Sequence, residues 1–513
     1  MYFGGSQRKG AVFLERDGIL IEDPGDIGGP QRINLLPETP LALRLLQRLF
    51  PLFIVTHHSG VARGIVDGSR MEQTNQTLLE KLFRLGISIE RIYVCPHGPS
   101  HGCQFITPDP HHLLLASEEF QIDLGLSFVV GDHPHDLRLA IEAGATGVYV
   151  LTGYGRKHLG ELPPQAIVSE GIWDAASTIS RIALSREPSG PREEEMDKAA
   201  SILRQGGVVA FPTETVYGLG ANALDPKAVA RIFEIKGRPR FDPLIVHLCD
   251  AGQARRLVAS LPEMAKRLME RFWPGPLTLV LPKGEVVPEI VTGGLNSVAI
   301  RMPEHPVALE MIRRAGVPVA APSANLFGHL SPTEASHVRA QLGGRIDMLL
   351  DGGPCPVGVE STVVSLLGQR PELLRAGGTT LEEIESVTGP ILGSADGSMP
   401  PRSPGQLSRH YCPRTPLWMV ESASGAPTGK KVGLLAFREP PHGKEFEAVE
   451  VLSSSGDLRE AAANLFAAMH RLDVLGLDLI VAERVPGIGL GLAINDRLMR
   501  ASRTTRAGTH RRN

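Results

Sequence analysis

The chain has 513 residues, of which 42% are hydrophobic and 21% are charged. This composition is ordinary for a globular protein and excludes general disorder and collagen-like repeats. The formal net charge of −3 and the pI near 6.6 argue against a globally basic nucleic-acid-binding protein, although they leave room for a local basic groove. At roughly 150 residues per domain, the length predicts about three domains.

The cysteines and the N-terminus indicate the compartment. An odd and sparse set of cysteines is typical of reduced thiols in the cytoplasm rather than of a disulfide framework. The set comprises Cys95, Cys103, Cys249, Cys355 and Cys412. The first residues lack the apolar core of a secretory signal, and no apolar stretch reaches the ~18–20 residues of a membrane span. We therefore expect a cytoplasmic protein without membrane contact.

Two segments rich in proline, glycine and serine divide the chain. They lie at about 184–195 and 393–416 and have the composition of linkers. The predicted division is a first domain at 1–185, a second at 193–392, a linker or lid at 393–416, and a C-terminal domain at 417–513.

Hydrophobic patterning predicts an α/β architecture in each domain. In the first domain, short apolar runs at 11–14, 52–56 and 127–132 alternate with helical patterns at 39–49 and 71–85. This alternation predicts a doubly wound parallel sheet with helices on both faces. The second domain mixes strands and helices and predicts a mixed twisted sheet. The third has a strand at 432–437, a helix near 458–475 and a strand at 479–485, which predicts a small Rossmann-like domain.

The second domain concentrates cations and hydroxyl groups near the ends of predicted elements. The segments are PTETVYGLGA (212–221), KGRPRFDPLIVH (236–247), SVAIRMP (297–303), APSANLFGHLSPT (321–333), GVESTVV (358–364) and LRAGG (374–378). In an extended segment, Lys236 and Arg238 would face the same side. Such a set suits a polyanion such as a nucleoside triphosphate, and arginine can also grip a carboxylate through two parallel bonds. No Walker A motif is present, so an ordinary P-loop site is excluded.

These motifs, in this order, resemble the YrdC-like threonylcarbamoyl-AMP synthase family. The resemblance covers about 193–389, and SPGQLSRHYCP (403–413) with GLGLAINDRL (489–498) resembles the long form, which has an added C-terminal domain. It implies an enzyme that makes threonylcarbamoyl-adenylate and pyrophosphate from L-threonine, bicarbonate and ATP with Mg²⁺. The product would serve tRNA modification through a downstream threonylcarbamoyl transferase complex.

The resemblance also assigns residues to the two substrates. Threonine would meet Thr215, His247, Arg301 and Ser361. ATP would meet Lys236, Arg238, Asp242, Ser297, Ser323, Asn325, Ser331 and Arg375, with Tyr411 closing over the nucleotide. Asp242 stands where the family usually has asparagine, which either weakens ATP binding or helps to hold a metal ion. A histidine after an apolar strand is more often a packed core residue than a base, so His247 takes its role from the motif alone.

The first domain resembles the haloacid dehalogenase-like phosphatases, nearest to the heptose bisphosphate branch. FLERDG (13–18), THHSG (56–60) and VGDHPHD (130–136) carry this resemblance, which places Glu15, Asp17, Thr56, Asp132 and Asp136 in the site. Glu15 replaces the nucleophilic aspartate of the family, and Thr107 replaces its lysine. These changes predict a domain that no longer hydrolyses phosphate esters efficiently. A partial zinc loop retains Cys95, His97 and Cys103, while Phe105 takes the place of the remaining ligand; an unmetallated loop is an equal reading.

The C-terminal residues allow two readings. The sequence from Arg497 onward is basic and is read either as a solvated tail or as an arm that contacts RNA phosphates. The alternatives for the whole chain are accordingly a non-catalytic module that binds structured RNA, and a sugar-phosphate phosphatase acting through the first domain. Pyrophosphate release that requires threonine and bicarbonate together distinguishes the synthase from both.

Overall fold

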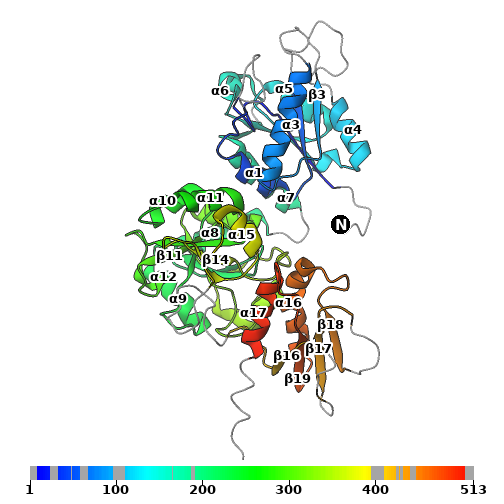
Figure 1. The fold of residues 1–513 in the computed structure, drawn as a ribbon. Helices are drawn as coiled ribbons and strands as arrows, with labels where there is room; N and C mark the ends of the chain where they lie inside the picture. Colours follow the sequence, from blue (N-terminus) through cyan, green and yellow to red (C-terminus); the bar gives the residue numbers. More distant parts are fainter. Residues whose placement is uncertain are drawn as a thin grey trace, which may run out of the picture. The chain divides into compact units, whose positions relative to one another are not determined.

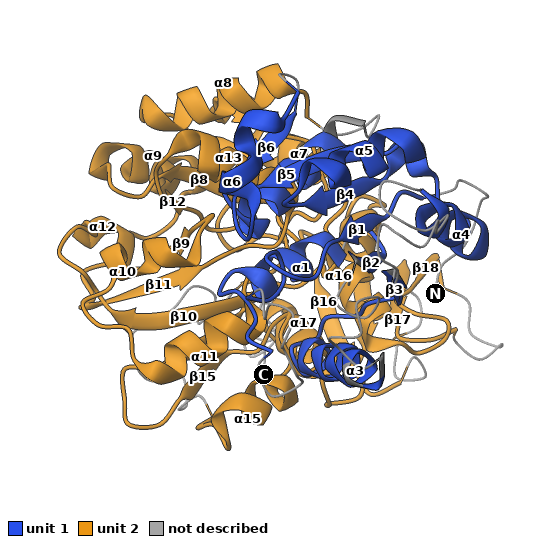
Figure 2. Cartoon of the chain, turned by 90° about the horizontal axis from the view of Figure 1, so that it is seen from above, with its two compact units in different colours: residues 1–186 blue, residues 187–513 orange. Residues whose placement is uncertain are grey.

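A computed structural model describes most of the chain, and the chain forms two compact units. Unit 1 spans residues 1–186 and unit 2 spans residues 187–513 (Figure 2). The described residues are 9–22, 33–47, 49–57, 68–95, 110–163, 166–186, 191–393, 410–422, 427, 431–439 and 446–502. Every helix among them is too short or too polar to cross a membrane.

Unit 1 is built on a parallel sheet of six strands. Its order is β3-β2-β1-β4-β5-β6, with all neighbours parallel. The strands are β1 (Val12–Leu14), β2 (Leu52–His57), β3 (Arg91–Cys95), β4 (Phe128–Gly131), β5 (Thr146–Val150) and β6 (Ile167–Ser169). The helices are α1 (Thr39–Gln47), α3 (Gly68–Arg84), α4 (His111–Phe120), α5 (Pro134–Ala143), α6 (Gly155–His158) and α7 (Ile172–Arg186).

The helices of unit 1 cover the sheet as the alternating pattern requires. Side chains of α4 and α5 share a core with Phe13, Phe53 and Val129 of the sheet. Helices α1 and α7 pack against each other, and α7 also packs on β5 and β6. Because the strands are parallel and central, both faces of β1 and β4 are buried.

Unit 2 contains a mixed sheet of nine strands (Figure 1). Its order is β13-β7-β8-β12-β9-β11-β10-β14-β15. The strands are β7 (Val209–Phe211), β8 (Gly218–Asn222), β9 (Ile245–His247), β10 (Leu277–Pro282), β11 (Ser297–Arg301), β12 (Val319–Ala320), β13 (Met348–Leu349), β14 (Thr362–Ser365) and β15 (Glu372–Arg375). The helices are α8 (Glu193–Arg204), α9 (Pro226–Lys236), α10 (Ala254–Leu257), α11 (Glu263–Phe272), α12 (Glu289–Thr292), α13 (Pro306–Ala315), α14 (Ala335–Leu342) and α15 (Leu381–Thr388).

The same unit holds a second sheet of four parallel strands, in the order β16-β19-β17-β18. The strands are β16 (Leu417–Val420), β17 (Val432–Ala436), β18 (Ala448–Val451) and β19 (Leu479–Glu483), and the helices are α16 (Leu458–Asp473) and α17 (Gly491–Ser502). Residues of α16 and α17 share one hydrophobic core with Val216, Leu330, Val359 and Tyr411, which belong to loops of the larger sheet and to the second linker. The two sheets of unit 2 are therefore joined by buried apolar contact.

The predicted α/β fold class is confirmed, with a parallel sheet in unit 1 and a mixed sheet in unit 2. The predicted domain boundaries at 185, 193, 392 and 417 stay a prediction. Two local readings were wrong. Lys236 and Arg238 do not lie in an extended segment, because Lys236 ends α9 and Gly237 caps it in the left-handed conformation at φ 63°. The basic sequence from Arg497 is not a tail from its start, because Arg497 and Arg500 belong to α17 and Arg497 is fully buried.

Candidate active site

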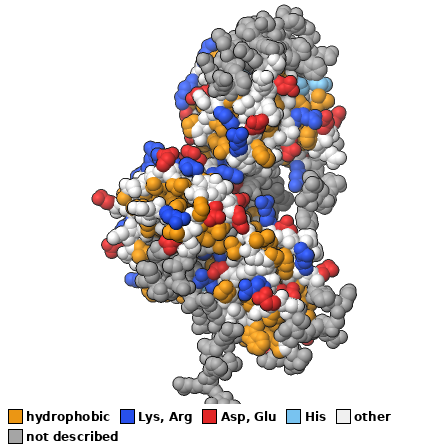
Figure 3. All heavy atoms as spheres, viewed as in Figure 1, with side chains coloured by type: hydrophobic (Ala, Val, Ile, Leu, Met, Phe, Trp, Pro, Cys, Tyr) orange, Lys and Arg blue, Asp and Glu red, His pale blue; other side chains and the backbone are white. Residues whose placement is uncertain are grey.

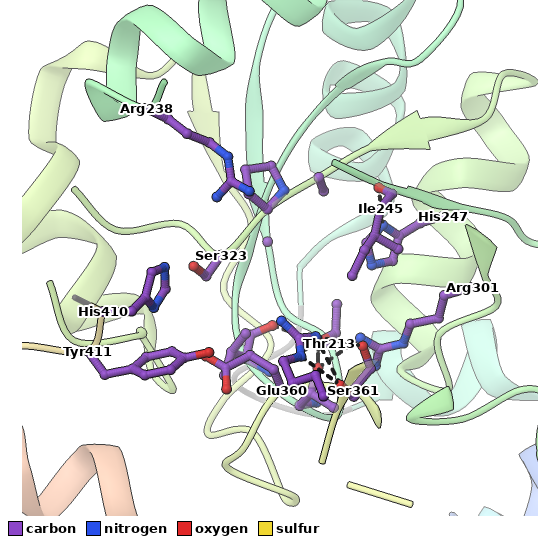
Figure 4. Close-up of a pocket in the computed structure, with 16 residues that line it drawn as sticks. Thr213, Arg238, Ile245, His247, Arg301, Ser323, Glu360, Ser361, His410 and Tyr411 are labelled. Atoms are coloured by element: carbon purple, nitrogen blue, oxygen red, sulfur yellow. Dashed lines mark hydrogen bonds between the residues drawn. The ribbon is translucent and has the colours of Figure 1, made fainter. Parts of the chain in front are cut away.

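One pocket of unit 2 gathers most of the predicted substrate residues. It is a partly open cleft lined by residues from several loops and strand ends of the larger sheet and by His410 and Tyr411 of the second linker. All of the residues predicted for threonine line it, and so do Arg238, Ser323, Arg375 and Tyr411 from the set predicted for ATP (Figure 4). Lys236, Asp242, Ser297, Asn325 and Ser331 are described but do not line the pocket.

Strand register brings Arg301 and His247 together. β9 and β11 are parallel neighbours in which Arg301 pairs with His247, and each residue ends its strand. Side chains at the ends of adjacent parallel strands emerge at the same edge of a sheet. Both are almost fully buried, and both face the pocket.

Arg301 is held by the hydroxyl-rich turn between β7 and β8. Its Nη2 donates to Glu214 Oε1 at 2.5 Å, its Nη1 to Thr215 Oγ1 at 3.0 Å, and its Nε to the Gly275 carbonyl at 3.3 Å. Thr213 Oγ1 lies 2.9 Å from Thr215 Oγ1 and stabilises the turn. The guanidinium is thus fixed in direction, and Glu214 balances its charge before any ligand binds.

His247 is a neutral imidazole. Burial, with the nearby charge of Arg301, lowers the pKa of His247 to about 3. Its Nδ1 lies 3.2 Å from the Ile245 carbonyl oxygen. A group with this pKa is a weak base near neutral pH, so the packed reading of His247 fits the structure better than a role as general base.

Arg375 and Ser361 come from the antiparallel pair β14–β15 and its preceding loop. Arg375 Nη2 donates to Ser361 Oγ at 3.1 Å, and Nε and Nη2 donate to the Ser361 carbonyl at 3.0 and 2.9 Å. Ser361 Oγ also lies 2.8 Å from Thr278 Oγ1 of β10. The arrangement fixes a second buried guanidinium in the pocket wall.

Lys236 supports the loop that carries Ser323 instead of lining the pocket. Its Nζ donates to the carbonyl oxygens of Ser323 at 2.5 Å and Asn325 at 2.6 Å, and to Asn325 Oδ1 at 3.3 Å. Burial lowers the pKa of Lys236 well below its ordinary value, while the surrounding acceptors favour an ammonium group. Asn325 Oδ1 also accepts from Ser323 Oγ at 2.5 Å, so both predicted residues shape this loop.

Arg238 enters the pocket from another side (Figure 4). It forms an ion pair with Asp242, which does not line the pocket. Its Nη2 lies 2.9 Å from Asp242 Oδ1, but its N–H groups are directed at the carbonyl oxygens of Asp242 (3.2 Å) and Pro243 (2.9 Å). Within the described chain, both carboxylate oxygens of Asp242 lack a hydrogen-bond donor. Burial raises the pKa of Asp242, and the charges of Arg238 and Lys236 oppose this shift.

Tyr411 closes one side of the pocket from the second linker. Its backbone has φ 63°, a left-handed conformation that is strained for a tyrosine and that proteins retain mostly at functional positions. The segment is fixed by Cys412 N, which donates to the Gly328 carbonyl at 2.8 Å. The buried Tyr411 hydroxyl and His410 Nδ1 have no hydrogen-bond partner among the described residues. Both side chains line the pocket, so a ligand there can supply the missing partners.

Several residues of the pocket were not predicted from the sequence motifs. Thr213, Glu360 and His410 line the pocket, and Glu214 pairs with Arg301. Each stands within or beside a quoted motif, so its position was available from the sequence. Its role depends on a partner far along the chain, which no local spacing reveals. Ser331 and Ser297 take other places: Ser331 Oγ donates to Glu360 Oε1 at 2.6 Å, and Ser297 begins β11 at the end opposite Arg301.

In unit 1, the predicted phosphatase residues gather at the carboxyl ends of β1, β2 and β4. Thr56 Oγ1 donates to Glu15 Oε1 at 2.7 Å, and Asp132 Oδ2 accepts from the Tyr154 amide at 2.7 Å. Burial raises the pKa of Glu15 well above its ordinary value, and Asp136 adds to the shift. Burial also raises the pKa of Asp136 to about 7. These carboxyl groups therefore resist ionisation.

Asp17, the predicted acid or base of unit 1, is engaged by its neighbour. Arg16 Nε and Nη2 donate to its two carboxylate oxygens at 2.9 and 2.6 Å. His97, Cys103, Thr107 and the side chain of Cys95 lie outside the described residues. Among the residues that the structure describes, no group of His, Cys, Asp and Glu has the geometry of a metal site.

Comparisons with known proteins agree with this geometry. Residues 201–377 match the Sua5/YciO/YrdC family, described as telomere recombination, and residues 379–503 match the C-terminal domain of threonylcarbamoyl-AMP synthase. Residues 107–175 match a HAD-hydrolase-like family, so unit 1 is HAD-like, as predicted.

The matches to individual relatives cover nearly the full length of those relatives. The chain is 47% identical over 326 residues to threonylcarbamoyl-AMP synthase of Bacillus subtilis, which covers 60% of this chain and 93% of that protein. It is 37% identical over 384 residues to the enzyme of Schizosaccharomyces pombe, covering 64% and 93%.

A solved structure shows the same likeness. The crystal structure of Pyrococcus abyssi Sua5 complexed with L-threonine is similar with a TM-score of 0.57 and 46% identity, covering 60% of this chain and 94% of that one. With arginines, hydroxyl groups and a linker tyrosine converging in one pocket, and with relatives of this identity matched over almost their full length, the chain belongs to the threonylcarbamoyl-AMP synthase family.

Proposed function

We propose that unit 2 joins L-threonine, bicarbonate and ATP to give threonylcarbamoyl-AMP, pyrophosphate and water, for the modification of tRNA. The observation that carries the proposal is the convergence of Arg238, Arg301 and Arg375 with hydroxyl groups in one pocket. Buried guanidinium groups with fixed directions suit a substrate set that combines a carboxylate with a triphosphate.

Arg301 would bind the carboxylate of threonine. Its contacts with Glu214, Thr215 and Gly275 leave further N–H groups of the guanidinium available. Thr215 and Ser361 would accept or donate hydrogen bonds to the polar groups of the amino acid. His247 would form an uncharged wall of the threonine site, because its imidazole is neutral.

Arg238 and Arg375 would bind the phosphates, with Ser323 beside them. Tyr411 and His410 would close over the nucleotide and gain the hydrogen-bond partners that they lack. Mg²⁺ would enter on the triphosphate, where it neutralises charge. Glu360, the carboxylate of the lining, is already engaged by Ser331 and by Arg497.

In this reaction, the main task of the protein is to position the substrates. The threonine amine captures carbon dioxide, formed from bicarbonate with loss of water, to give a carbamate. A carbamate oxygen attacks the α-phosphorus and pyrophosphate leaves. The fixed arginines stabilise the charge that develops on the phosphates, and a closed pocket slows hydrolysis of the labile product.

The test is an assay of pyrophosphate release by the full chain. We expect release only when threonine, bicarbonate and ATP are present together. Release from ATP alone, or none with all three, would refute the proposal. An RNA-binding module would give no release and a steep salt dependence of RNA affinity. On the face shown in Figure 3, basic and acidic side chains are interspersed, which does not favour that alternative.

We also infer that unit 1 does not hydrolyse phosphate esters efficiently. Glu15 is a longer side chain than the family nucleophile and its pKa is raised, so the protonated and poorly nucleophilic form is favoured. Asp17 is paired with Arg16. Magnesium-dependent turnover of sugar phosphates that disappears in Asp17→Ala would overturn this inference.

A further inference from the structure

Arg497 is the buried arginine of α17, and it lies between the two sheets of unit 2. Its side chain is 0% exposed, although arginine is rarely fully buried without partners. Its helix neighbours Ile494, Leu498 and Ala501 belong to the apolar core that α17 shares with α16 and Tyr411. Because water does not reach this guanidinium, its charge must be balanced by partners within the protein.

The first contact is with Glu360 in the pocket lining. Arg497 Nε donates to Glu360 Oε2 at 2.9 Å, and Ser331 Oγ donates to the other carboxylate oxygen at 2.6 Å. Burial raises the pKa of Glu360, but the charges of Arg497 and Arg375 outweigh burial and hold it below its ordinary value. Glu360 is thus an ionised group whose charge is balanced from the C-terminal helix.

Besides contacts within α17 to Asp496 and Ala493, Arg497 reaches one residue beside the pocket lining and one residue of the lining. Arg497 Nη1 donates to the carbonyl of Ala376, the residue after Arg375, at 2.6 Å. The guanidinium carbon lies 5.4 Å from the ring centre of Tyr411, within range of a cation–π contact. Glu360 in turn precedes Ser361. One guanidinium therefore holds the neighbours of Ser361 and Arg375 together with Tyr411 itself.

We propose that Arg497 is a positioning residue of the pocket, which keeps Glu360, the Ala376 carbonyl and the Tyr411 ring in one arrangement and cancels the charge of Glu360. The inference rests on the proposed function, because Arg238, Arg375 and Tyr411 are assigned there to ATP. It adds that the C-terminal helix is a working part of the nucleotide site.

Charge balance predicts what the loss of Arg497 does. Arg497→Met leaves a buried carboxylate beside the phosphates with only Arg375 and the Ser331 hydroxyl to compensate it, and an incompletely compensated buried charge is unfavourable. We expect the KM for ATP to rise and kcat to fall, together by about 100-fold in kcat/KM. Because protonation of Glu360 relieves the repulsion, the KM of this variant should fall as the pH is lowered from about 8 to 6, whereas the wild-type KM should stay nearly flat.

Two further variants separate charge from position. Arg497→Lys keeps the charge but lacks the planar fork, so we expect a KM for ATP near the wild-type value with a reduced kcat. The double variant Arg497→Met with Glu360→Gln removes both charges, so it should fold better than Arg497→Met, lose the pH dependence of KM and keep a low kcat.

The matched control is Arg471→Met in α16. Arg471 also pairs with a glutamate, Glu450 (2.9 and 2.7 Å), but this pair is partly exposed and belongs to the smaller sheet and its helices, outside the pocket lining. We expect wild-type kcat and KM. Equal losses in this control, or wild-type kinetics and pH profile in Arg497→Met, would overturn the inference.

ATP binding by equilibrium dialysis, without threonine, separates this inference from the proposed function. A wild-type chain that binds ATP but releases no pyrophosphate refutes the proposed function. The inference is then supported if Arg497→Met binds ATP more weakly than the wild type, and it is overturned if the two affinities are equal. A wild-type chain that does not bind ATP refutes both.

Discussion

The pairing of Arg301 with Glu214 makes the part of the pocket that we propose binds threonine sensitive to the shape of the side chain as well as to its charge. The guanidinium bonds to a carboxylate, a hydroxyl and a carbonyl in different directions. A lysine ammonium carries the same charge but lacks the planar fork that satisfies such partners together with a bidentate ligand.

We predict that Arg301→Lys raises the KM for threonine about 100-fold, with a smaller effect on the KM for ATP. Threonine titration in the pyrophosphate assay measures it. Arg313→Lys, which alters a surface pair with Glu310 on α13, serves as the control and should leave both constants unchanged. An unchanged threonine KM in Arg301→Lys would place the amino-acid carboxylate elsewhere.

Asp242 stands where the family usually has asparagine, and its negative charge offsets the positive charge of Arg238. Its carboxylate lies 2.9 Å from the guanidinium, while backbone carbonyls already fix the direction of that group. We predict that Asp242→Asn lowers the KM for ATP by up to about tenfold, because Arg238 keeps its position and loses a competing anion.

ATP titration at constant threonine measures this change. Asp347→Asn, in the partly exposed pair with Arg231, controls for the loss of one negative charge. A higher KM in Asp242→Asn would instead mean that the carboxylate, and not the backbone, orients Arg238.

At the scale of elements, the loop before Glu360 lies in close contact with α16. Gly358 has φ 73°, and a Cβ there would lie 2.2 Å from the Ala462 carbonyl oxygen and 2.5 Å from the Ala463 Cα. Both are backbone atoms, so the clash is relieved only by moving the loop away from the helix.

We predict that Gly358→Ala destabilises the protein by roughly 1–3 kcal/mol and lowers kcat, because the displaced loop carries Glu360 away from Arg497. Urea unfolding and the pyrophosphate assay measure the two effects. Gly344→Ala is the control, since no atom lies within 4 Å of its added Cβ. Wild-type stability in Gly358→Ala would show that the contact between loop and helix is loose.

Most of what could be predicted came from the ends of the strands and helices and from the order of the sequence motifs. The alternation of apolar runs predicted the parallel sheet of unit 1, and the family resemblance of the ordered motifs assigned residues of several loops to the same substrates. In the structure, parallel neighbours such as β9 and β11 end at one edge of the sheet. Ser297 shares a motif with Arg301 but begins the strand that Arg301 ends, about 13 Å away at ~3.3 Å per residue. The placement of Lys236 outside the pocket lining could not be predicted, because it depends on the left-handed turn at Gly237 that ends α9.

Long-range partners could not be predicted. The local pattern around Arg497 is basic and suggests a solvated tail. Its burial depends on Glu360, which is 137 positions away in sequence. Ion pairs of this kind are set by the packing of whole elements, so a single sequence contains no local signal for them.

At the scale of the whole molecule, unit 2 holds several neutral histidines that are buried or half-buried. Burial lowers the pKa of His247 to about 3 and those of His305, His337 and His470 to about 4, and it places the pKa of His410 well below its ordinary value. In the unfolded chain these groups titrate near pH ~6.5. The unfolded state therefore binds more protons than the folded state below that pH.

Stability from these histidines is fully present above about pH 6.5 and is lost as the pH falls toward about 4. The loss is about 1.4 kcal/mol per pH unit for each of the buried His247 and His410, and it is smaller for the partly exposed His337 and His470, where solvent screens the charge. Urea unfolding at several pH values measures the slope. Fluorescence in a Trp173→Phe background reports on unit 2, where Trp273 is fully buried.

The stacked pair His337 and His470, with ring centres 3.8 Å apart, offers the internal comparison. Replacing both with glutamine should make the loss of stability on acidification shallower. A slope equal to the wild-type slope would show that these two imidazoles are not held neutral by the fold.

The place of Arg497 so late in the chain has a consequence for how the protein is made. A growing polypeptide can bury its earlier strands, yet the pocket residue Glu360 lacks its arginine partner until α17 has left the ribosome and docked. Nascent chains that stop before that helix would carry every motif between Pro212 and Gly378 and still lack the contacts of Arg497 with the pocket.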